Sequence, residues 1–78
     1  MKEFTIQFSS VQDVQKFVAL ATGQTFPIIV GNDYHKVNGK SFMEIFSLNF
    51  EYPIHVWMEC TDDQYRQFLA DARKYRET

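Results

Sequence analysis

A chain of 78 residues that is 45% hydrophobic fits one small globular domain, residues 1–78, and is too apolar for intrinsic disorder. Its net charge is -2, whereas nucleic-acid-binding proteins are usually strongly basic, so we expect no nucleic-acid partner. The single cysteine, Cys60, excludes an internal disulfide and a multi-thiolate metal site. Neither a signal peptide nor a long apolar run is visible, which predicts a cytoplasmic protein without membrane contact.

The first expected elements are a strand and a helix. The strand has one buried face, because its apolar residues alternate with polar ones. Its apolar positions are Phe4, Ile6 and Phe8. Ser10 is placed to cap the helix, with Asp13 three residues on, and Gly23 is expected to end it in the left-handed conformation. The helical apolar positions are Val11, Val14, Phe17, Val18 and Ala21.

A hairpin follows the first helix. Residues 26–30 are predicted to form a short apolar strand, and Gly31-Asn32-Asp33 contains residues typical of a turn. The returning strand is predicted over residues 34–37, which places His35 in it. Asn38-Gly39 then turns the chain again. The sequence therefore predicts two antiparallel strands that lead directly into a second helix.

That second helix opens with Ser41 and Glu44, which have the spacing of a capping box. Its apolar residues cannot all face one way. Spacing favours Phe42 and Ile45 inward with Leu48, allows Phe46 inward as well, and leaves Met43 and one aromatic residue near the surface. Two interpretations remain open: an exposed methionine beside an aromatic ring suits a protein contact, and a wide core-facing stripe suits packing.

The last strand and helix follow Pro53. Apolar and other residues alternate along the strand: Ile54, Val56 and Met58 against His55, Trp57 and Glu59. Thr61 and Gln64 form a third capping box. One face of the final helix is apolar: Tyr65, Phe68, Leu69, Ala72 and Tyr75 or Arg76.

The element order is therefore β-α-β-β-α-β-α, an α+β fold. Two right-handed crossovers of this length place their helices on the same side of a sheet. We expect an open-faced β-sandwich: one four-stranded antiparallel sheet with three helices on one face. No nucleophile–base pair, paired carboxylates or Gly-rich phosphate loop can be located, so we expect neither an enzyme nor a cofactor.

The uncovered face of this sheet should carry His55, Trp57 and Glu59. Other residues expected there are Thr5, Gln7, Ile29 and Tyr34. An exposed tryptophan can mark a partner or dimer surface, although single exposed aromatics are common on open sheets. A metal site at His55 and Glu59 would need ligands that the sequence does not supply, so no metal is expected. Cys60 is interpreted as a small apolar filler.

The run Lys40-Ser41-Phe42-Met43, followed by Ser47-Leu48, is similar to a pattern in HPr, the small phosphocarrier family of the bacterial phosphotransferase system. The element order and the length also resemble that family. The resemblance implies an HPr-like fold over the whole chain. In the family, the serine of this run is a regulatory phosphorylation site and the helix after it meets partner proteins.

The same resemblance exposes a departure from the family. The position of the phosphate-carrying histidine corresponds to Asp13, or to Gln12 after a one-residue shift, and the position of the arginine corresponds to Gln15. A relay of this kind needs an imidazole nucleophile and a cation to hold the phosphate. Glu44 also stands where the family usually has glycine. We therefore expect no phosphohistidine relay.

Paralogues without the histidine act in catabolite regulation by binding proteins, and this chain resembles them. The resemblance implies a protein partner, such as a transcription regulator or an HPr-type kinase. The implied contact residues are Lys40, Met43, Phe46 and Ser47. Ser41 is open to two compatible roles, helix cap and phosphorylation site. The alternative function is a split β-α-β module that binds a small molecule or dimerises, unrelated to sugar transport.

Overall fold

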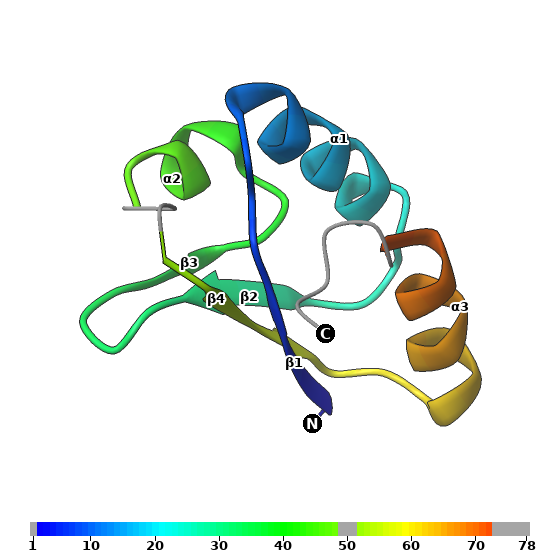
Figure 1. Ribbon diagram of the computed structural model, residues 1–78. Coiled ribbons are helices and arrows are strands. Elements are labelled where there is room, and N and C mark those ends of the chain that lie inside the picture. Colours follow the sequence, from blue (N-terminus) through cyan, green and yellow to red (C-terminus); the bar gives the residue numbers. More distant parts are fainter. Residues whose placement is uncertain (1, 49–51, 73–78) are drawn as a thin grey trace.

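The computed structural model describes residues 2–48 and 52–72, and it has the predicted order of elements (Figure 1). The elements are β1 (Lys2–Ile6), α1 (Val11–Thr22), β2 (Ile28–Gly31), β3 (Lys36–Asn38), α2 (Phe42–Phe46), β4 (Ile54–Met58) and α3 (Asp62–Ala72). Tyr75 and Arg76, expected on the last helix, lie outside the described residues.

The four strands form one antiparallel sheet in the order β1-β4-β2-β3. The three helices cover one face and leave the other open, so the predicted open-faced sandwich is confirmed (Figure 1). The register pairs Phe4 with Val56, and Val56 with Val30. The two central strands, β4 and β2, therefore place their apolar residues beneath the helices.

The core lies between the sheet and the helices. Ile54, Val56 and Met58 of β4 are fully buried, as their alternation predicts. From the helices, Phe17 packs edge to face with Phe68, the ring centroids being 5.9 Å apart. Such ring pairs stabilise a core beyond the area that they bury. The remaining buried residues are Ile6, Phe8, Val14, Ala21, Phe26, Ile28, Val30, Ile45, Leu48 and Ala72.

The expectations for the end of α1 and the start of β2 are wrong. Gly23 has φ of -76° and ψ of -6°, so α1 ends in a right-handed turn rather than a left-handed one. Its N–H still bonds back to the carbonyl of Leu20 at 3.3 Å, which closes the helix without a positive φ. The second strand begins at Ile28 instead of residue 26, because Pro27 has no N–H to donate to a ladder.

The β2–β3 hairpin also differs in its bounds. Asn32 Oδ1 accepts hydrogen bonds from the backbone N–H groups of Tyr34 (2.8 Å) and His35 (2.9 Å). This side-chain turn keeps both residues in the loop, so β3 begins only at Lys36. A Cβ at Gly31 would lie 2.3 Å from the carbonyl oxygen of His35, so glycine is required by this close approach. His35 and Tyr34 are therefore loop residues, not strand residues.

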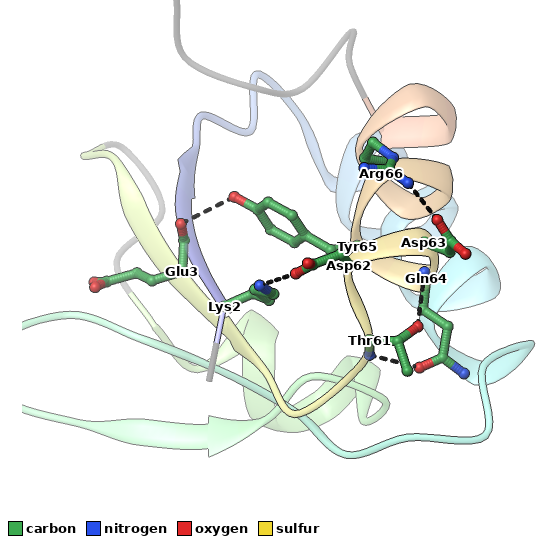
Figure 2. Close-up of polar contacts among 8 residues, drawn as sticks. All are labelled: Lys2, Glu3, Thr61, Asp62, Asp63, Gln64, Tyr65 and Arg66. Atoms are coloured by element: carbon green, nitrogen blue, oxygen red, sulfur yellow. Dashed lines mark hydrogen bonds and ion pairs between the residues drawn. The ribbon is translucent and has the colours of Figure 1, made fainter.

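The edge strand β1 is joined to the start of α3 by the contacts in Figure 2. The Tyr65 hydroxyl donates to the Glu3 carbonyl at 3.2 Å, and Lys2 forms an ion pair with Asp62. Their hydrogen bond and mutual attraction raise the pKa of Lys2 and lower the pKa of Asp62. Side-chain contacts of this kind cover an edge that could otherwise pair with another chain.

The same helix start is closed by the predicted capping box, drawn in Figure 2. Thr61 Oγ1 accepts from the Gln64 N–H at 3.1 Å, and Gln64 Oε1 accepts from the Thr61 N–H at 2.9 Å. Just before it, Cys60 is half-buried and packs against the core, as expected for a small apolar filler. Burial raises the pKa of the Cys60 thiol, since a less hydrated site disfavours the thiolate.

Candidate functional site

The candidate site is the short helix α2, which is held by the turn that precedes it. The Gly39 N–H donates to the carbonyl of Ile28 at 2.8 Å, and the Asn38 side chain accepts from the Lys40 N–H at 2.9 Å. A Cβ at position 39 would lie 2.6 Å from Ile28 Cγ2. Glycine is thus needed for α2 to lie this close to β2.

Ser41 caps α2, as predicted. Its hydroxyl oxygen accepts from the Glu44 N–H at 3.4 Å. The return half of the capping box is absent, because the Glu44 carboxylate lies 3.5 Å from the Asn38 N–H instead. The Ser41 N–H donates to the Asn38 carbonyl at 3.1 Å. The tight turn thus occupies the donor that Glu44 was expected to bind, and only half of the predicted box forms.

The apolar side chains of α2 divide between core and solvent. Ile45 and Leu48 are buried, whereas Met43 is 73% exposed and Phe46 is 44% exposed. The predicted division is confirmed for Ile45, Leu48 and Met43, whereas Phe46, which spacing also allowed inward, is exposed. Phe42 is half-buried and stacks on Phe46, with ring centroids 5.5 Å apart and an interplanar angle of 15°. We call Met43 and Phe46 the α2 surface.

Lys40 and Ser47, the two polar residues expected beside this surface, both form hydrogen bonds within the chain. The Lys40 ammonium donates to the carbonyl of Gln24 at 2.9 Å, across the gap between α2 and the loop after α1. The Ser47 hydroxyl donates to the Glu44 carbonyl at 2.6 Å and so closes the end of α2. Both residues therefore position the α2 surface, and the sequence gives no sign of either contact.

At the start of α1, Asp13, which matches the family's phosphate-carrying histidine, takes part in an ordinary helix cap. The Asp13 N–H donates to Ser10 Oγ at 3.3 Å, and the Asp13 carboxylate accepts from the Ser9 N–H at 2.9 Å. Gln12 and Gln15 are exposed on α1. This helix start thus carries a carboxylate folded back onto its own backbone.

Neither histidine lies at that helix start. His35 is in the β2–β3 hairpin, which Figure 1 shows well away from the start of α1. His55 is on β4, where alternation directs it to the face opposite the helices. In the described ranges, no group of three His, Cys, Asp or Glu side chains has the geometry of a metal site.

The open face of the sheet carries the other predicted cluster. Trp57 pairs in register with Glu3 and Ile29, and His55 pairs with Thr5 and Gly31. Of the other residues expected on this face, Tyr34 lies in the hairpin, while Gln7 and Glu59 lie beyond the ends of β1 and β4.

Two exposed residues were missed by the sequence reasoning. Tyr52, 66% exposed, lies just before β4. Lys36 reaches across the open face toward Trp57, with its ammonium 5.1 Å from the ring centroid. An aromatic residue before a proline and a lysine at the start of a strand are both common. The sequence therefore held no specific signal for either.

Comparison of the chain with models of protein families gave no match, and a search of curated proteins also gave none. No helix in residues 2–48 or 52–72 combines the length and apolar content needed to cross a bilayer.

Proposed function

We propose that this chain is a non-catalytic, HPr-like protein of bacterial carbon regulation that binds a protein partner in the cytoplasm through its α2 surface. The observation that supports this most is the exposure of Met43 beside Phe46, on a helix whose neighbouring apolar residue Ile45 is fully buried. Methionine adapts its shape to a partner, and adjacent exposed apolar side chains favour association.

The local bonds around α2 support a docking role because they fix the helix before any partner arrives. Ser41 caps its start and Ser47 closes its end. Lys40 ties it to the loop after α1. A pre-ordered surface loses less conformational entropy on binding. The partner implied by the resemblance is a transcription regulator or an HPr-type kinase, and a kinase would act on Ser41.

The absence of a relay is the second part of the proposal. Transfer from Enzyme I, the phosphotransferase that loads HPr, requires an imidazole at the start of α1, where this chain has Gln12 and Asp13. A carboxylate there repels an incoming phosphate. Incubation with Enzyme I and labelled phosphoenolpyruvate should leave no acid-labile label on the chain. Such a label would refute this part.

A single substitution should not rebuild the relay. Asp13→His supplies the imidazole, yet Gln15 still stands where the family has its arginine. Without that cation, little charge is available to stabilise the phosphate. We therefore expect Asp13→His to accept little phosphate, and Asp13→His combined with Gln15→Arg to accept more. Equal labelling of the two variants would show that the cation is dispensable.

A further inference from the structure

The open face of the sheet has an apolar centre between charged edges. Trp57 and Ile29 are paired in register on the two central strands. The adjoining pair is His55 and Gly31. The rings of His55 and Trp57 stack with centroids 5.6 Å apart and an interplanar angle of 29°. At Gly31 the backbone of His35 and Lys36 fills the place of a side chain, since a Cβ there would lie 2.3 Å from the His35 carbonyl oxygen.

Charges of opposite sign lie at the two edges of this face. Glu3 lies on edge strand β1, and its carboxylate is 3.4 Å from His55 Nδ1. Lys36 lies on edge strand β3, and its ammonium is held over Trp57 at 5.1 Å from the ring centroid. Within the described residues, no carboxylate lies at ion-pair distance from Lys36. The face is therefore negative at one edge and positive at the other.

We propose that this open face is the interface of a symmetric dimer, with a second copy of the chain as its occupant. A two-fold axis along the strands, between β4 and β2, places β1 of one copy over β3 of the other. Glu3 then faces the edge that carries Lys36 of the second copy. The approach of Glu3 to the Lys36 edge therefore occurs twice in the dimer, once on each side of the axis.

The same axis brings apolar side chains together at the centre. It places β4 of one copy over β2 of the other, so Trp57 lies over Ile29 of the second copy. His55 then lies over Gly31 of the second copy. An apolar centre with a charged rim is the usual anatomy of a protein interface. The helices, including the α2 surface, remain outside this contact and free to bind a partner.

The dimer should be weak because the face is small. Four strands of this length, spaced as in ordinary sheets, cover roughly 300 Å² per copy, well below the area of a standard stable interface. Association should therefore depend on protein concentration and, through its charged edges, on salt. Trp57 is the only tryptophan, so its fluorescence reports directly on burial of the face.

The test is sedimentation velocity on the purified chain over a concentration series up to about 1 mM, with a charge-swap cycle. Glu3→Lys and Lys36→Glu should each lower the association constant by about tenfold, since each places like charges together. The double variant should return to within a few-fold of wild type. Both side chains are exposed, so the variants should fold, which circular dichroism checks.

Matched controls carry the same charge changes on the helical side. Asp71→Lys and Lys16→Glu are exposed on α3 and α1 and should leave association unchanged. The Trp57 emission should shift to the blue with concentration in wild type, and less in either single variant. A monomer at about 1 mM overturns the proposal. The proposal is also overturned if Glu3→Lys and Lys36→Glu each dimerise as strongly as wild type. It is overturned as well if the double variant dimerises no more strongly than the single variants.

Discussion

The Lys40 ammonium donates a 2.9 Å hydrogen bond to the carbonyl oxygen of Gln24, sixteen residues earlier in the chain. This contact joins the turn before α2 to the loop that follows α1. Gln24 is itself held, because its side chain donates to the Leu20 carbonyl at 3.1 Å. The orientation of the α2 surface therefore depends on a contact from α1.

Replacing Lys40 with methionine should lower the free energy of unfolding by about 1 kcal/mol, because it removes a charged donor from a half-buried carbonyl and keeps the stem. Lys16→Met is the matched control, since Lys16 is exposed on α1, and it should change stability little. Urea unfolding measures both. Equal stability of the two variants would show that the Lys40 bond contributes nothing.

The N-cap of α2 gives a separate prediction. Ser41→Ala should destabilise the protein by about 1 kcal/mol, and Ser41→Asp should retain most of that stability because aspartate is also a good N-cap. Ser9→Ala is the control and should change stability little. The Asp13 carboxylate accepts from the backbone N–H of Ser9, which alanine keeps. The urea unfolding midpoint measures the stability of the three variants. A larger loss in Ser41→Asp than in Ser41→Ala would contradict the capping role.

The Lys2–Asp62 ion pair gives a pH dependence with a definite sign. The pKa of Asp62 is lowered from its ordinary 3.8, so its contribution is present above that value and is lost as the pH falls through the lowered pKa. The pKa of Lys2 is raised from 10.5, so its contribution is present below that value and is lost as the pH rises through the raised pKa.

The test measures the urea unfolding midpoint of wild type and of Lys2→Met from acid to alkaline pH. The difference between the two should be largest near neutral pH and should disappear in acid. Salt should reduce it at neutral pH, because both side chains are accessible to solvent. A difference that persists in strong acid would show that Lys2 stabilises the fold through the packing of its stem, not through Asp62.

The sequence predicted the elements that hydrophobic period and capping residues determine. The alternation around Val56 and the reciprocal cap of Thr61 and Gln64 both appear as expected. Predictions that depended on one residue's usual conformation were weaker. Gly23 closes α1 without a positive φ, and the Asn32 side chain holds His35 in a loop where a strand was expected.

The candidate site was predictable where it depends on helical spacing alone. The exposure of Met43 and the burial of Ile45 follow from their positions on one short helix. The contacts of Lys40 with Gln24 and of Lys36 with Trp57 join distant segments. They depend on how the loops and strands pack, which local pattern does not specify.

The α2 surface is tested most directly by partner capture with three immobilised baits: wild type, Met43→Asp and Ala70→Asp. Both substituted residues are exposed, Met43 on α2 and Ala70 on α3, so each variant should stay within about 0.5 kcal/mol of wild-type stability. Ile45→Asp, by contrast, would bury a charge and should unfold the chain. Melting curves establish these points before any binding is measured.

The capture is performed from a lysate of the source cell, and the retained proteins are quantified by mass spectrometry. The account predicts a protein that wild type and Ala70→Asp retain equally and that Met43→Asp loses by tenfold or more, about 1.4 kcal/mol of binding free energy. Retention of the same proteins in the same amounts by Met43→Asp would contradict it.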